Sequence, residues 1–262
     1  MSSVMTQSLR DSHRGLAGFA VGTALVAAMY AGFYPQMADG AMAEAVEGFS
    51  PGLREALNMD DISTAAGYLG SSVFGIIVPL IAVIYGIATG TRGVAGDEEA
   101  GYLDLLLAHP VSRTRLLLHR FAALTAGAFL IAAAVWLAML AVRTSAQLHS
   151  ISIGQLTSQC LALALLATTF GAIATTIGAA TGSRPAALAG TTVIAVLAYA
   201  ANTFATQIGA DAARYASPFH YYIGGEPLKN GFQSADLGIL AAACGVLLSI
   251  ATVTFNRRDL TS

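Results

Sequence analysis

Six long apolar stretches dominate the pattern of hydrophobic and polar positions along this chain. None contains Asp, Glu, Lys, Arg or His; they span residues 15–34, 66–91, 121–142, 151–183, 185–210 and 237–256. About 20 apolar residues in a helix suffice to cross a hydrocarbon core of roughly 30 Å. The sequence therefore predicts an all-α integral membrane protein with six transmembrane helices in one transmembrane domain, residues 1–262.

The stretch 151–183 exceeds the length of one crossing. It is expected to tilt, to kink or to extend beyond the hydrocarbon. The polar leader 1–14 suits a helix lying at the interface, and a disordered tail is the alternative.

Loop charge sets the expected orientation, because Lys and Arg accumulate on the cytoplasmic side. With a cytoplasmic N-terminus, the inner segments hold most of the 13 basic residues: Arg10, Arg14, Arg92, Arg113, Arg115, Arg120, Arg184, Arg257 and Arg258. The outer segments 35–65 and 211–236 then carry much of the acidic charge, and 92–120 is a cytoplasmic loop. Both termini are predicted to be cytoplasmic.

Composition supports a membrane protein and limits its chemistry. Charged residues make up 11% of the chain and hydrophobic residues 55%, whereas soluble domains carry about 25% charged residues. Cys160 and Cys244 lie inside apolar stretches and suit helix packing. The five histidines are scattered, so no metal site is expected. No nucleic-acid partner is expected either.

Several kinds of site are missing from the sequence. The only lysine, Lys229, follows Pro227-Leu228, so a G-x-x-x-x-G-K-[ST] phosphate loop does not occur. The apolar stretches lack the ionisable groups that proton-coupled transporters and intramembrane proteases use. Sodium coupling through backbone carbonyls remains open. We therefore expect a chain that is not an enzyme and binds no ATP.

Local signals within the apolar stretches predict packing and turns. Pro79 predicts a kink in the second span, and a static bend or a moving hinge both fit it. Thr and Gly recur over 168–181, which favours tight helix packing over a polar path lining. Gly182-Ser-Arg-Pro185 predicts a tight turn. The outer segment 206–236 holds an aromatic cluster at 217–225, which suits the headgroup level, and two short helices dipping into the outer leaflet are also possible within it.

The charge-dense segment after the second span predicts a short helix at the membrane surface. Asp97, Glu98 and Glu99 suit the first turn of a helix, a leucine-rich stretch follows, and Pro110 ends it. Ser112 can then cap the next helix. Such a helix can rest on lipid or dock into a partner's groove, and the residues alone leave both possibilities open.

The stretch Gly96-Asp-Glu-Glu-Ala-Gly-Tyr-Leu-Asp-Leu-Leu-Leu-Ala-His-Pro-Val-Ser-Arg113 resembles the inner-loop signature of ABC-2-type transporter permeases. That signature, G-E-x-x-x-G-T-L-x-x-L-L-x-x-P-x-x-R, joins the second and third spans. Asp97 replaces the common Glu, and Tyr102 replaces the common Thr. The segments 217–222 and 255–260 and the six-span layout resemble the family as well.

The resemblance implies a permease that pairs with a second, identical or paralogous permease and with two ATP-binding subunits. ATP and Mg would be held by those subunits, and this chain would hold no cofactor. The implied coupling helix and its flank supply the expected ATPase-coupling residues: Asp97, Glu98, Glu99, Tyr102, Leu103, Leu106, Leu107 and Arg113. Candidates for lining the path between the permeases are Asn202, Thr203 and Tyr85. The leader 1–14 would be an interfacial connecting helix.

The leading hypothesis is the permease subunit of an ATP-driven exporter in a bacterial inner membrane. Its uncharged spans suit an amphipathic small molecule better than a bare ion, and the resemblance to the family implies a drug or antibiotic as cargo. A secondary carrier or channel that needs no ATPase is the first alternative. The second is a membrane partner subunit that moves no cargo.

Overall fold

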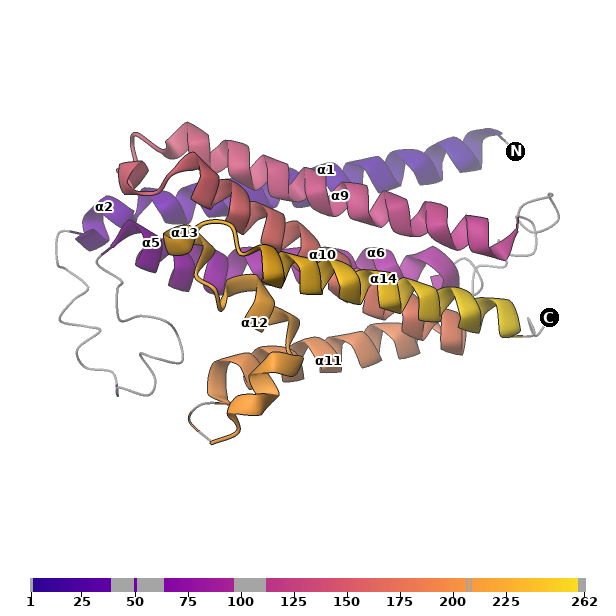
Figure 1. Ribbon diagram of the computed structural model, residues 1–262. Coiled ribbons are helices and arrows are strands. Elements are labelled where there is room, and N and C mark those ends of the chain that lie inside the picture. The colour runs from indigo at the N-terminus through magenta and orange to yellow at the C-terminus, as the bar shows by residue number, and fades with distance from the viewer. Residues whose placement is uncertain are drawn as a thin grey trace. The chain divides into compact units, whose positions relative to one another are not determined.

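The computed structural model describes residues 2–38, 50, 64–96, 112–205, 207 and 209–258, with the backbone alone for residues 2–13 and Val94. Every regular element within these ranges is a helix (Figure 1). The α-helices are α1 (Ser2–Gly32), α2 (Tyr34–Gln36), α5 (Ala65–Tyr68), α6 (Val78–Thr91), α9 (Arg113–Val142), α10 (Ile153–Thr181), α11 (Arg184–Phe204), α12 (Pro218–Ile223), α13 (Pro227–Asn230) and α14 (Ser234–Arg257). Two π-helices, η2 (Leu69–Ile77) and η3 (Arg92–Gly96), and two 3₁₀-helices, η4 (Leu148–Ser150) and η5 (Asp211–Ala216), complete them.

Six helical segments are long and apolar enough to cross a membrane. They are Arg14–Gln36, Ala65–Thr91, Arg113–Val142, Ile153–Thr181, Arg184–Phe204 and Ser234–Arg257. The all-helical architecture and six helices of membrane-spanning length, both expected from the sequence, are thus confirmed within the described residues. The cytoplasmic placement of the termini stays a prediction. The outer-segment positions 39–49 and 51–63 and the loop 97–111 lie outside the described residues.

The helices and the apolar stretches end at different residues. α1 begins at Ser2 and continues without a break, so residues 2–14 of the leader are helical and continuous with the first span. α9 begins at Arg113, ahead of the apolar stretch 121–142, because Ser112 caps it: the Arg115 backbone N–H donates to Ser112 Oγ at 3.3 Å. α11 ends at Phe204, before residue 210. Apolar content predicts membrane depth, whereas caps determine where helices end.

The chain forms two compact units. The first comprises Met1–Ile81, Phe129–Leu161 and Glu226–Phe232, and the second comprises Ala82–Ala128, Ala162–Gly225 and Gln233–Ser262. In the first unit, the Tyr68 hydroxyl donates to the Tyr30 carbonyl at 2.9 Å, which joins α5 to α1. The Tyr34 and Tyr68 rings also pack, with centroids 5.7 Å apart.

The wide turns of η2 show how the helix accommodates Pro79. The Val78 backbone N–H bonds to the Val73 carbonyl, five residues back, immediately before the proline. Pro79 has no N–H, and in an α-helix its ring would crowd the carbonyl four residues earlier. A π-helical turn relieves that crowding. Where the sequence predicted a kink, the structure therefore has a π-helix of nine residues.

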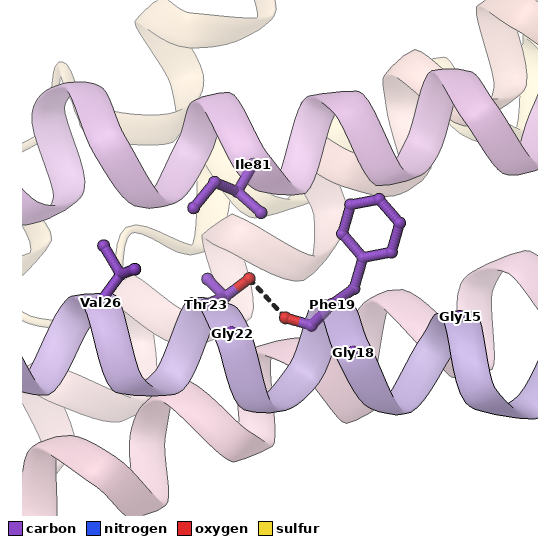
Figure 2. A pocket seen from close by; sticks show the side chains of 7 residues that line it. All are labelled: Gly15, Gly18, Phe19, Gly22, Thr23, Val26 and Ile81. Carbon is purple, nitrogen blue, oxygen red and sulfur yellow. Dashed lines mark hydrogen bonds between the residues drawn. The ribbon is translucent and has the colours of Figure 1, made fainter.

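The first unit carries a shallow apolar hollow of about 390 Å³ along α1 (Figure 2). Its lining residues are Gly15, Gly18, Phe19, Gly22, Thr23, Val26 and Ile81. The Thr23 hydroxyl donates to the Phe19 carbonyl at 2.6 Å and so presents no free proton to the hollow. A side-chain carbon added at Gly15, Gly18 or Gly22 would meet no atom within 4 Å.

α10 is the most buried of the six spans, with 72% of its apolar window enclosed. In the second unit its threonine hydroxyls bond back to carbonyls four residues earlier, as Thr168 does to Ala164 and Thr175 to Gly171, both at 2.8 Å. Thr176 also donates across to the Leu247 carbonyl on α14 at 3.0 Å. The tight packing predicted for 168–181 is confirmed.

The connection between α11 and α14 holds the aromatic segment. Ser217 caps α12 by accepting from the Phe219 backbone N–H at 3.2 Å, and its hydroxyl donates to the Ala198 carbonyl of α11 at 2.7 Å. The Phe219 ring lies 5.3 Å from Tyr199 and 5.4 Å from Phe170. The two short α-helices that were one possibility here are present as α12 and α13.

Replacing Arg214 with alanine is expected to raise the pKa of His220 toward its ordinary value. Partial burial and the nearby Arg214 charge both lower that pKa, and Asp236 opposes them. Because the fold favours neutral His220, the stability linked to it is present above the ordinary pKa and is lost as the pH falls. A histidine NMR titration of the purified chain tests this, with Arg257→Ala as the control. An unchanged His220 midpoint in Arg214→Ala would contradict the assignment.

Candidate functional site

Both flanks of the loop 97–111 are described, and both belong to the second unit. η3 leads into the loop, and Ser112 and Arg113 follow it. Basic residues gather around these flanks, at what we call the arginine-rich end: Arg92, Arg113, Arg115, Arg120, Arg184, Arg257 and Arg258. The loop between the flanks is the predicted partner contact, and this end is where the loop joins the spans.

The flank that precedes the loop packs on α10 and α11. Ala95 of η3 is 1% exposed. The Ala95 Cβ lies 3.4 Å from the position that a Cβ added to Gly178 of α10 would take. A Cβ added to Gly96 would lie 3.8 Å from the Arg184 side chain of α11. Small residues allow this close approach. The start of the loop is therefore held against the ends of two spans.

The flank that follows the loop is tied to the end of α14. One guanidinium nitrogen of Arg113, Nη1, donates to the Arg258 carbonyl at 2.8 Å and lies 3.4 Å from the Phe255 carbonyl. The guanidinium carbon also lies 5.9 Å from the centroid of the Phe255 ring. Carbonyls at the end of a helix accept no hydrogen bond from within that helix. The arginine donates hydrogen bonds to them, and the negative end of the helix dipole stabilises its positive charge.

A second arginine continues the contact to α10. Arg258 Nη1 donates to the Ala179 carbonyl at 3.1 Å and lies 3.5 Å from the Gly178 carbonyl. Gly182 follows with a φ of +66°, and a Cβ there would lie 2.6 Å from the Arg258 guanidinium. Glycine thus supplies the left-handed turn that ends α10 and leaves room for the arginine.

The predicted turn Gly182–Pro185 is confirmed by this geometry. Ser183 caps α11 by accepting from the Ala186 backbone N–H at 3.4 Å. Beneath the arginines lies an apolar cluster of four buried residues: Leu117, Ala179, Ala251 and Phe255. α9, α10 and α14 therefore share one core directly below the candidate site.

A comparison with protein-family models matches residues 3–260 to the ABC-2 family transporter protein model. The chain belongs to the ABC-2 transporter family. A search of curated proteins finds no match. ABC-2 permeases are membrane transport components that generally dimerise and work with separate ATP-binding subunits. This match confirms the family membership that we inferred from the loop signature, and it covers nearly the whole chain.

Most of the predicted coupling residues of this ABC-2 chain lie outside the described residues: Asp97, Glu98, Glu99, Tyr102, Leu103, Leu106 and Leu107. Arg113 is described, and its guanidinium is directed to carbonyls of its own chain. Arg115, two residues later, is exposed. The coupling roles stay a prediction, and the structure adds a positional role for Arg113.

The three path-lining candidates lie in the second unit of the ABC-2 chain. Tyr85 is 4% exposed and its hydroxyl donates to the Leu124 carbonyl of α9 at 3.2 Å. Thr203 is 8% exposed, near the end of α11, and Asn202 beside it is half-buried. Within one chain Tyr85 therefore serves helix packing, and Asn202 is the most accessible of the three.

Cys160 and Cys244 are free and buried, as expected for packing residues. Cys244 Sγ lies 3.3 Å from Thr169 Oγ1 in the second unit. The described part of the chain holds no group of three or more His, Cys, Asp or Glu side chains that could bind a metal.

Sequence reasoning missed Arg258 and its role at the end of α10. It counted Arg257 and Arg258 only toward the basic charge of the inner segments, because an arginine after an apolar helix usually lies among headgroups. The useful signal was Gly182, since a glycine that ends a helix leaves carbonyls for a nearby cation. The partner of those carbonyls could not be read from the sequence, because Arg258 follows Ala179 by 79 residues.

Proposed function

We propose that this chain is the permease subunit of an ATP-driven ABC exporter, with both termini in the bacterial cytoplasm. The family match over residues 3–260 carries the proposal. The absence of a phosphate loop from the sequence supports it, because the energy must then come from another subunit. Two permeases, identical or paralogous, form the path, and two ATP-binding subunits hold ATP and Mg.

The loop 97–111 is proposed to contact the ATP-binding subunit. Its flanks pack on α10, α11 and α14 within the second unit, so the loop joins a well-packed base. A force applied to the loop would act on several spans at once. This arrangement supports a docking role over a helix that rests on lipid alone.

The proposed cargo is an amphipathic small molecule such as a drug or antibiotic. The six spans contain no ionisable side chain over the apolar stretches, so a path between two permeases offers hydroxyl, amide and aromatic groups. Such groups suit a molecule with apolar and neutral polar parts better than a bare ion.

Purification of the chain from its own host in mild detergent tests the function. We expect a stoichiometric partner with a phosphate loop, identified by mass. A second permease in the same complex would distinguish a heterodimer from a homodimer. Transport by the chain alone, reconstituted in vesicles with no ATPase, would instead establish a carrier or channel and overturn the proposal.

The double substitution Glu98→Lys and Leu106→Arg is expected to release the ATP-binding subunit and leave the spans folded. It reverses one acidic charge and places a cation among the leucines proposed to dock. Co-purification of the ATPase checks this, with size-exclusion behaviour as the measure of folding. A matched pair of exposed changes, Arg115→Glu and Leu118→Arg, serves as the control. Full retention of the ATPase would remove loop docking from the proposal.

A further inference from the structure

We propose that Arg113 and Arg258 form a link that makes the ends of α14 and α10 follow the loop 97–111. The link comprises these two guanidinium groups and the carbonyls they bind, on Phe255, Arg258, Gly178 and Ala179. Arg113 acts here as a positioning residue, through its own chain. This inference rests on the proposed function only for the source of the motion.

The link connects three helices in series. Arg113 belongs to the first turn of α9 and binds the end of α14, while Arg258 follows α14 and binds the end of α10. Each arginine therefore satisfies carbonyls of the next helix. Arg113 and Arg258 are 145 residues apart in the chain, so the contact is tertiary.

Neighbouring basic residues show that the link is selective. Arg115 and Arg257 are exposed, whereas Arg113 and Arg258 are half-buried. Arg113 also lies against the Phe255 ring, which is fully buried. A guanidinium that only neutralised headgroups would have no reason to lie over a buried ring and donate to backbone carbonyls.

A second contact holds the same two helices together. The Asn256 side-chain amide donates to Thr114 Oγ1 at 3.0 Å, one residue along each helix from the arginine contact. The shared core of Leu117, Ala251 and Phe255 lies beneath both contacts. Motion of the first turn of α9 is therefore transmitted to α14 through a short path of direct contacts.

The position of Arg113 gives the link a mechanical role. Ser112 and Arg113 are the first described residues after the loop, and α9 is continuous from Arg113 onward. Displacement of the loop must move the backbone that carries Arg113. A static cap on α14 would bind the same carbonyls, so the test must measure motion as well as stability.

The first experiment needs no ATPase. Cys160 and Cys244 are replaced by alanine, and Thr114→Cys with Asn256→Cys reports the proximity of α9 and α14 through a short thiol-reactive crosslinker. Arg113→Ala is expected to lower the crosslinking rate about tenfold, because charge-assisted bonds are lost. Arg113→Lys should give an intermediate rate, since lysine keeps the charge and loses the planar group. Arg115→Ala is the control and should match the parent.

The second experiment uses the complex with its ATP-binding subunit in lipid vesicles. A fluorescent label on Val253→Cys, a position 47% exposed on α14, reports ATP-dependent movement. We expect ATP to shift its emission in the parent and in Arg115→Ala. Arg113→Ala should lose the shift, measured per bound ATPase.

The outcomes separate the link from the proposed function. A crosslinking rate for Arg113→Ala equal to that of Arg115→Ala overturns the link, as does a full ATP-dependent shift in Arg113→Ala. Loss of ATPase binding with normal crosslinking would place Arg113 in the ATPase contact and also overturn it. If the purified parent carries no ATPase, the proposed function fails, and the crosslinking rates still decide whether Arg113 holds the ends of α9 and α14 together.

Discussion

Replacement of Gly86 by valine is expected to prevent this chain from accumulating as a folded membrane protein. Gly86 lies on α6 where the helix meets α10, and a Cβ there would collide with the Ala167 carbonyl oxygen and lie 3.1 Å from the Gly171 nitrogen. One turn later, a Cβ on Gly90 would lie 2.5 Å from the Gly171 oxygen. The two backbones are thus in direct contact along this face.

The cost is large because no side chain can move aside. Both clashing groups are backbone atoms of α10, the most buried span, and Gly171 itself packs against Leu124 of α9. Valine would have to separate α6 from α10 within the second unit, at about 3 kcal/mol or more. Alanine at the same position should cost less and still destabilise.

Yield after membrane extraction and the temperature of half-unfolding in detergent measure the effect. Gly245→Val is the matched control, since Gly245 on α14 is exposed and an added Cβ meets no atom within 4 Å. We expect the control to unfold close to the parent. Equal yields and unfolding temperatures for the two variants would show that α6 and α10 do not meet at Gly86.

The number and type of the helices could be predicted from the sequence, because membrane crossing imposes one requirement on every span. The stretch 66–91, for example, has no charge over a length that spans the core. Its interior could not be predicted, because an apolar pattern is the same for a π-helix and an α-helix. Leu69–Ile77 shows no sequence signal beyond the Pro79 that follows it.

The sequence predicted the local features of the candidate site, but not the tertiary contacts that its residues make. The loop 97–113 stood out by its own residues, since acidic and leucine-rich turns are local features. The partner of Arg113 did not stand out, because it is a backbone carbonyl at residue 258, and every residue offers a carbonyl. Tertiary contacts to the backbone leave little trace in one sequence, which is why Arg113 was assigned to the ATPase alone.

Gly75→Ala is expected to destabilise the first unit by about 1–3 kcal/mol, whereas Gly70→Ala is not. In the π-helical turns of η2, a Cβ on Gly75 would lie 2.5 Å from the Gly70 oxygen. A Cβ on Gly70 would meet no atom within 4 Å, so the same substitution in the same segment is the matched control. Unfolding temperature in detergent distinguishes the two variants.

Pro79 determines how the helix can respond to Gly75→Ala. Conversion of η2 to an α-helix would remove the clash at Gly75 and would bring the Pro79 ring against the carbonyl of residue 75. With Pro79 in place, the π-helical form keeps the clash at residue 75 and the α-helical form acquires a clash with the proline ring. The double variant Gly75→Ala, Pro79→Ala should therefore recover part of the lost stability, since alanine permits the α-helical hydrogen bond.

The double-mutant comparison also distinguishes a static bend from a moving one. An α-helical η2 would rotate the residues before the segment relative to those after it, by about 100° for each residue removed from the wide turns. Val73 is fully buried and Ile76 is 43% exposed, so thiol labelling of Val73→Cys and Ile76→Cys reports that rotation. Recovery of stability with unchanged labelling would mean that η2 stays π-helical without its proline. Recovery with altered labelling would show that the segment has two accessible registers, and Pro79 then selects the one observed.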